Sequence, residues 1–87
     1  MDSNPILHAA MMESIENQIR NNDPPETKKT LDRLMTQGHS KQDAMNLIGT
    51  VLAAEMYEIL RHNRPYDAKR YIEELNRLPR APFDEQK

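Results

Sequence analysis

The longest run of helix-compatible residues is also the most apolar part of the chain. It extends from Ser40 to His62 and reads SKQDAMNLIGTVLAAEMYEILRH. Plotted at about 100° per residue, its apolar positions cover about half of the circumference, which is wider than the ~100° stripe of a surface helix. Ser40 is a suitable N-cap, and no proline interrupts the run. We therefore predict one long helix over 40–62 that other helices cover from more than one side.

Shorter amphipathic patterns on both sides predict three further helices. Prolines stand at or next to the start of each, where the missing backbone N–H is not needed, and glycine or proline follows two of their ends. We expect these helices at Pro5 to about Asn21, at Pro24 to about Gln37 with Asp23 as its cap, and at Pro65 or Tyr66 to Arg77.

Together these patterns define the fold class. We predict an all-α protein of four helices in a small antiparallel bundle or array, with the helix over about 40–62 at its centre. Residues 1–78 form a single helical domain. Two prolines and mixed charge in 79–87 predict a mostly disordered tail.

Two ionisable residues fall on faces that the pattern buries. Glu55 lies about 20° from the centre of the apolar arc of the long helix, and His8 lies at the centre of the apolar face of the first helix. A buried carboxylate needs a partner, because an unpaired buried charge costs several kcal/mol. We therefore predict that His8 and Glu55 meet as a buried hydrogen-bonded pair that fixes how the two helices pack.

The same residues admit a second interpretation. Imidazole and carboxylate groups are good ligands for a metal ion between helices, so His8 and Glu55 also define a candidate metal- or small-ligand site. Glu16, Glu58 and His62 are its candidate extensions, since Glu58 and His62 stand one turn apart. Whether a metal binds stays open, and the sequence requires no cofactor.

The composition of the chain limits the classes of partner that it can bind. The 87 residues carry a formal net charge of -2 and no cysteine, which excludes disulfides and thiolate sites and makes nucleic acid an unlikely partner. A glycine turn between two helices, with Lys28, Lys29, Arg33 and Lys41 nearby, keeps a helix-turn-helix DNA binder as a lesser alternative. No apolar run approaches the ~18 residues of a membrane span, and MDSNPILH lacks the pattern of a signal peptide, so we expect a soluble cytoplasmic protein.

Self-association is the expected interaction. The first and the long helix together offer more apolar surface than an 87-residue chain readily covers, which indicates a homodimer or docking on another protein. Catalysis has little support, because the chain holds only two glycines, no phosphate-binding loop and no Ser-His-Asp order.

Two segments resemble a known family when they are taken together: NPILHAAMMESIENQI and NDPPETKKTLDRLMTQGHSKQDAMNLIGTVLAAEMYEIL. The N-P-x-x-H start, the D-P-P-E start of the second helix and the internal glutamate of the third are similar to a small all-helical bacterial domain of unknown function. The resemblance covers about Asn4 to Leu78 and implies a helical fold without an established activity. Members carry further histidines where this chain has Met12 and Asn46, so a metal site built from the family's histidines is incomplete here.

The sequence thus predicts a structural or protein-interaction module as the leading function. A metal- or small-ligand-binding protein that uses His8 and Glu55 is the alternative.

Overall fold

The computed structural model describes residues 5–80, and within them the chain forms four helices and no strand. They are α1 (Pro5–Asn21), α2 (Pro25–Thr36), α3 (Lys41–His62) and α4 (Ala68–Arg77). The all-α prediction is confirmed, and so is the number of helices. From residue 81 on, the predicted tail lies outside the described residues.

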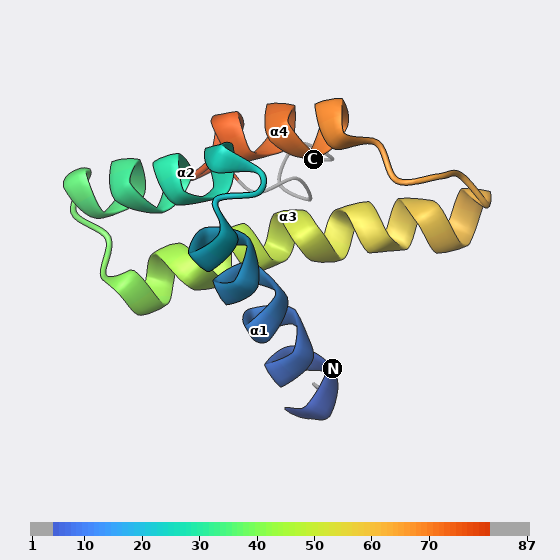
Figure 1. The fold of residues 1–87 in the computed structure, drawn as a ribbon, viewed down its shortest axis with the longest axis horizontal. Helices are drawn as coiled ribbons and strands as arrows, with labels where there is room; N and C mark the ends of the chain where they lie inside the picture. The colour runs from blue at the N-terminus through green and yellow to red at the C-terminus, as the bar shows by residue number, and fades with distance from the viewer. Residues whose placement is uncertain (1–4, 81–87) are drawn as a thin grey trace.

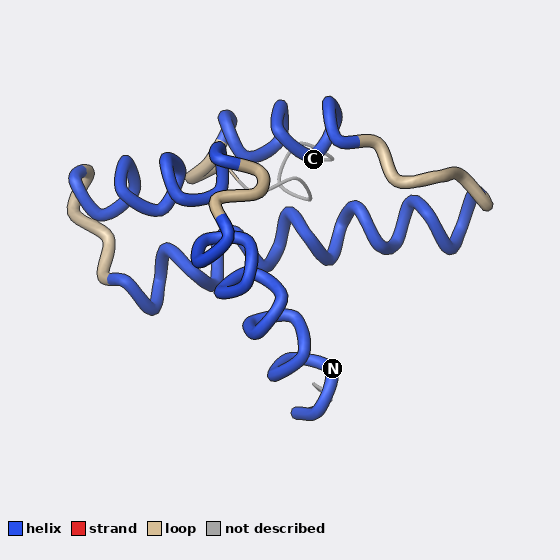
Figure 2. The backbone as a smooth tube through the Cα atoms, in the orientation of Figure 1, coloured by secondary structure: helices blue, strands red, loops and turns tan. Residues whose placement is uncertain are grey.

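The long helix α3 is the central element, because each of the other three helices packs against it. Helices α2 and α4 follow one another along one side of α3, whereas α1 crosses α3 obliquely and its N-terminal half points away from the other helices (Figure 1). Short loops join the elements in sequence order (Figure 2). This oblique crossing decides which part of α1 is covered.

Local side-chain chemistry explains where the helices begin. Ser40 caps α3 as predicted, since its Oγ accepts from the backbone N–H of Asp43 at 3.0 Å. Helix α4 begins later than the sequence pattern indicated, at Ala68, because the Asp67 carboxylate accepts from the backbone N–H of Arg70 at 3.2 Å. Helix α2 also differs from the prediction. Its N-cap is Pro24 and no side chain caps it, so Asp23 does not have the expected role.

The core consists of aliphatic side chains and one tyrosine from all four helices. Its buried members are Ile15, Leu31, Leu34, Ala44, Met45, Ile48, Val51, Tyr71, Leu75 and Leu78. At the crossing of α1 and α3, a Cβ placed on Gly49 would lie 2.9 Å from Cε of Met12, so the missing side chain permits the close approach. Over residues 5–80, none of the helices combines the length and the apolar content that crossing a bilayer requires.

Candidate functional site

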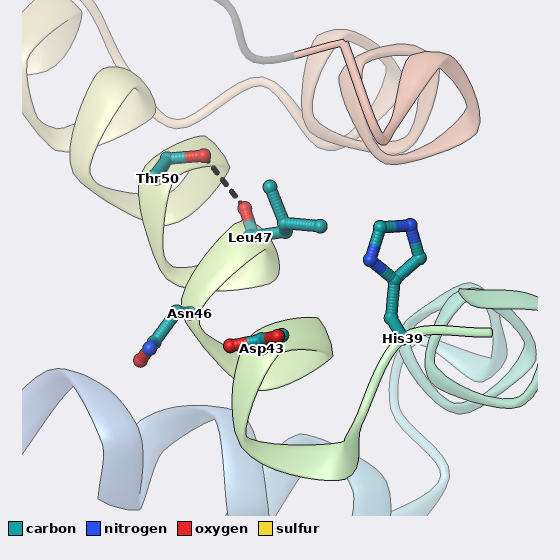
Figure 3. A pocket seen from close by; sticks show the side chains of 5 residues that line it. All are labelled: His39, Asp43, Asn46, Leu47 and Thr50. Carbon is teal, nitrogen blue, oxygen red and sulfur yellow. Dashed lines mark hydrogen bonds between the residues drawn. The ribbon is translucent and has the colours of Figure 1, made fainter. Parts of the chain in front are cut away.

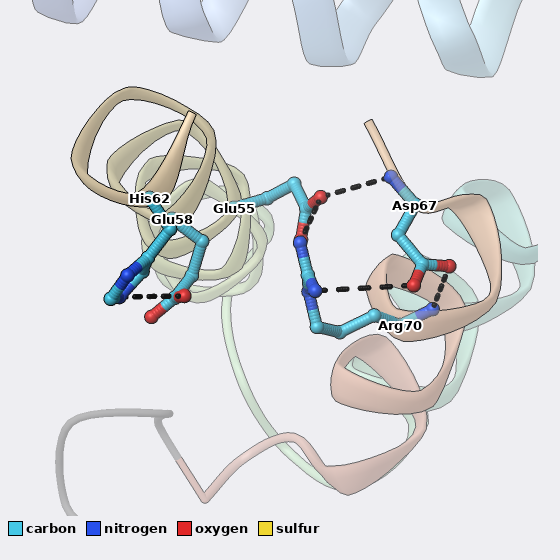
Figure 4. A network of polar contacts seen from close by, with 5 residues as sticks. All are labelled: Glu55, Glu58, His62, Asp67 and Arg70. Atoms are coloured by element: carbon cyan, nitrogen blue, oxygen red, sulfur yellow. Dashed lines mark hydrogen bonds and ion pairs between the residues drawn. The ribbon is translucent and has the colours of Figure 1, made fainter. Parts of the chain in front are cut away.

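The buried carboxylate of Glu55 is the centre of a polar network between α3 and α4. Glu55 is 4% exposed, and both of its oxygens accept hydrogen bonds from one guanidinium (Figure 4). Arg70 Nε donates to Oε1 and Arg70 Nη2 donates to Oε2, each at 2.9 Å. The backbone N–H of Asp67 adds a third bond to Oε2 at 3.1 Å. The predicted buried acid therefore has its charge and its lone pairs satisfied.

The connection between α3 and α4 brings these groups together. Asn63 ends α3 in the left-handed conformation, with φ 54°, and turns the chain back along the helix. An extended link of five residues, 63–67, covers roughly 16 Å, and the seven steps from Glu55 to His62 cover roughly 10 Å. The link therefore reaches back to the level of Glu55, where Asp67 and Arg70 meet it.

Arg70 is held by two acids at once. Its Nη1 lies 3.9 Å from Oδ2 of Asp67, in addition to the paired bonds with Glu55. The hydrogen bonds with Glu55, and the charges of nearby acids, raise the pKa of Arg70 above its usual value. The guanidinium therefore stays charged, and the network joins the first turn of α4 to the middle of α3.

His8 does not occupy the place that the sequence predicted for it. The residue lies one turn before Met12 in the part of α1 that points away from the other helices, and it is exposed. The prediction that His8 is buried is wrong, and Arg70 takes the predicted role of His8 as the partner of Glu55. The physical reason is the oblique crossing of the two helices. Helix α3 covers Met12 and Ile15, whereas the first turns of α1 lie beyond the crossing and away from α3.

The proposed extensions of a metal site are also spread out. His62 Nε2 lies 3.5 Å from Oε1 of Glu58 one turn earlier on α3, whereas Glu16 is exposed on α1. Among residues 5–80, no group of three histidine or acidic side chains is arranged to hold a metal ion. The metal- or small-ligand interpretation therefore stays a prediction without a gathered set of ligands.

A second polar centre, which the sequence analysis missed, joins three helices. Oε1 of Gln18 on α1 accepts from Thr27 Oγ1 on α2 at 2.8 Å and from Tyr71 OH on α4 at 2.9 Å. Thr27 and Tyr71 are almost fully buried, and burial raises the pKa of the Tyr71 hydroxyl. The only signal in the sequence is the polar Thr27 on the inner face of α2, and this signal does not identify its partner.

Two of the four basic residues of the helix-turn-helix interpretation have partners within the protein. Arg33 points toward α4, where it donates to the main-chain oxygens of Leu75 at 3.0 Å and Leu78 at 2.7 Å. Lys28 pairs with Asp32 one turn along α2 at 3.0 Å. Arg33 therefore binds two carbonyl oxygens at the C-terminal end of α4, and that of Leu75 also accepts from the backbone N–H of Leu78 at 3.2 Å. This contact removes one cation from the surface that the helix-turn-helix alternative would use to bind a DNA backbone.

An open groove of about 310 Å³ lies beside the first turns of α3 (Figure 3). The residues that line it are His39, Asp43, Asn46, Leu47 and Thr50. The Thr50 hydroxyl donates to the main-chain oxygen of Leu47 at 2.6 Å, so it is already engaged within its own helix. The groove thus includes His39 and Asp43 among its lining residues but no hydroxyl activated by a base.

Large apolar side chains are exposed on the second half of α3. Leu60 is 80% exposed, Tyr57 48% and Met56 37%. We call these three residues the distal α3 face. Leu60 lies one turn from both Met56 and Tyr57, so the three side chains are neighbours. They are separated from Glu55 by about 100–160° around the helix, so α4 covers one side of this segment and leaves the distal α3 face exposed.

Comparison with known proteins gives a family but no described activity. The family described as "Domain of unknown function (DUF1841)" matches residues 1–77. The match runs to Arg77, the last residue of α4, and therefore includes all four helices. It confirms the resemblance to a small domain of unknown function. No curated protein and no solved structure matches the chain.

Proposed function

The chain belongs to the DUF1841 family of unknown function, and from its geometry we propose that the protein is a protein-interaction module that binds an acidic amphipathic helix on the distal α3 face. The observation that carries the proposal is the 80% exposure of Leu60 beside two further exposed large side chains. Single exposed apolar residues are normal on protein surfaces, but neighbouring ones indicate a docking site.

The spacing of the distal α3 face suits a helical partner. Met56 and Leu60 stand four residues apart and Tyr57 and Leu60 stand three apart, which is the i, i+3, i+4 pattern by which amphipathic helices dock. Apolar side chains of a bound helix would remove this surface from water, at roughly 25 cal/mol for each Å² that they cover. The hydrophobic part of the binding energy thus comes from burial of the distal α3 face together with the apolar face of the bound helix.

The charges that flank the distal α3 face define the chemistry of the partner. Arg61 follows Leu60 directly, and its guanidinium lies 5.6 Å from the centre of the Tyr57 ring and donates to the Tyr57 hydroxyl. Arg64 is exposed just beyond the helix end, and its backbone N–H is held by the oxygen of Ile59 at 3.2 Å. The nearby acid Glu58 faces His62. The flank is therefore net positive and complements acidic side chains.

Two synthetic peptides test the proposal. Both are 18-residue amphipathic helices with leucines on one face; one carries glutamates beside the leucines and the other carries lysines. We expect the acidic peptide to shift the backbone amide resonances of residues 56–64 saturably, and the basic peptide to bind much more weakly. The Leu60→Glu variant should lose the interaction, since it places a charge at the centre of the distal α3 face.

A matched variant controls for surface changes elsewhere. Lys29→Glu alters an exposed residue on α2 and should leave the binding of the acidic peptide unchanged. The absence of saturable binding by either peptide, or equal binding by wild type and Leu60→Glu, would show that the distal α3 face is not a helix-binding site. Circular dichroism of Leu60→Glu establishes that its fold is intact.

A further inference from the structure

We infer that the helix bound by the distal α3 face is α1 of a second copy of this chain. The inference rests on the proposed function, because it names the partner of the same surface. Helix α1 has the required chemistry: its N-terminal half points away from the other helices (Figure 1), and Ile6 there is 81% exposed. Glu13 stands seven residues later on the same face of α1, at about 20° from Ile6.

The spacing of these residues matches the spacing on α3. Seven residues of helix correspond to about 10 Å, which is also the distance from Met56 to the end of α3 near Asn63. When α1 of the second copy lies parallel to α3 with Ile6 on Met56, Glu13 reaches the level of Arg64, just beyond the end of α3. One register therefore brings an apolar pair and an opposite-charge pair together, which is complementarity in both respects.

Two-fold symmetry would use this contact twice. In such a pair, α1 of each copy lies on α3 of the other, so the two contacts are identical. A stable dimer buries about 800 Å² on each partner, or about 400 Å² at each of the two helical contacts. That total is about one seventh of the 5927 Å² of accessible surface of one chain. The interface therefore needs only the projecting half of α1 and the second half of α3.

Charge reversal in solution tests the register. Sedimentation velocity and light scattering of the wild-type protein should give about twice the chain mass of 10.2 kDa. Glu13→Lys and Arg64→Glu should each weaken the dimer roughly fivefold or more, because each puts like charges in contact. The double variant Glu13→Lys with Arg64→Glu should restore it, since the pair is then reversed. Leu60→Glu should be monomeric.

The other outcomes distinguish the two proposals. A wild-type mass of 10.2 kDa at every concentration tested would overturn the second-copy inference, while the peptide titration separately decides whether the distal α3 face binds a helix. A dimer that survives Leu60→Glu, or a double variant that stays as weak as the single ones, would also overturn the inference. Circular dichroism of each variant shows whether its fold is intact, so that a lost dimer is not mistaken for a lost fold.

Discussion

Glu55 in the middle of α3 and Arg70 in the first turn of α4 form a two-bond ion pair, with both N–O distances at 2.9 Å. A third bond, from the backbone N–H of Asp67, completes the coordination of the carboxylate. The pair joins two helices that are connected by an extended link. Its contribution to the fold is to fix the position of α4 against α3.

Removal of the Glu55 carboxylate should therefore destabilise the protein. We expect Glu55→Ala to lower the free energy of unfolding by at least about 2 kcal/mol, because hydrogen bonds to charged groups contribute about 1.5–3 kcal/mol. Glu73→Ala is the control, since Glu73 is exposed on α4 and lies outside the proposed dimer contact. Urea titrations measure both. Equal urea midpoints for the two variants would show that the pair with Arg70 does not hold α4 in place.

The amide of Gln18 should be equally difficult to replace. Gln18→Leu removes the acceptor of two buried hydroxyls, those of Thr27 and Tyr71, and each unsatisfied group costs about 1–3 kcal/mol. We expect a loss of about 2–4 kcal/mol in urea unfolding. The exposed Gln37→Leu is the matched control and should change stability by less than about 0.5 kcal/mol. Similar losses of stability in both variants would show that the hydrogen bonds of Gln18 to Thr27 and Tyr71 do not hold the three helices together.

Alkaline pH should destabilise the protein through Tyr71. Burial raises the pKa of its hydroxyl above the usual value near 10, so the unfolded chain releases this proton at lower pH than the folded chain. The stabilisation is complete below pH 10 and declines above it, by at most about 1.4 kcal/mol per pH unit for one proton. Thermal melts from pH 8 to 11 should therefore decline more steeply for wild type than for Tyr71→Phe.

Tyr57→Phe serves as the comparison for the alkaline melts. Tyr57 is 48% exposed, and its replacement should leave the steep decline in place. Tyr66, whose pKa is raised chiefly by burial, is present in all three proteins and contributes a decline of the same sign to each. Parallel curves for wild type and Tyr71→Phe would count against the buried hydroxyl as the cause.

Periodicity and capping chemistry predicted most of the fold. The long helix, its Ser40 cap and the burial of Glu55 all follow from residues close together in sequence, because caps and apolar stripes are local properties. The partner of Glu55 could not be predicted in this way. A helical wheel assumes that the whole length of a face is covered, whereas α3 covers only part of α1 and leaves His8 exposed.

Arg70 was missed for a different reason. The sequence pattern places the start of α4 at Pro65 or Tyr66, which assigns the residues up to Asp67 to the helix and puts its first turn away from Glu55. The Asp67 cap, with Arg70 three residues later, was the available signal. Only the path of the extended link shows that this turn lies beside the middle of α3.

Metal ions should leave the stability of the protein unchanged. Both oxygens of Glu55 already accept hydrogen bonds from Arg70 or Asp67, and His8 is exposed on a different helix. We expect the same melting temperature in EDTA and in added zinc, for wild type and for His8→Ala, and no stoichiometric metal by elemental analysis. A melting temperature that falls in EDTA and no longer does so in His8→Ala would establish the metal-binding alternative instead.

Arg33 should control the end of α4 from a distance of more than 40 residues in sequence. Its guanidinium donates to the oxygens of Leu75 and Leu78 at the end of α4, where the Leu75 oxygen also accepts from the backbone N–H of Leu78. We expect Arg33→Met to lower the free energy of unfolding by about 1–3 kcal/mol. Hydrogen exchange should accelerate over residues 75–78 more than at the Ser40 end of α3. The exposed Lys29→Met is the control. Unchanged exchange at the end of α4 would mean that packing of Leu75 and Leu78 alone holds it, because those two side chains remain buried in the variant.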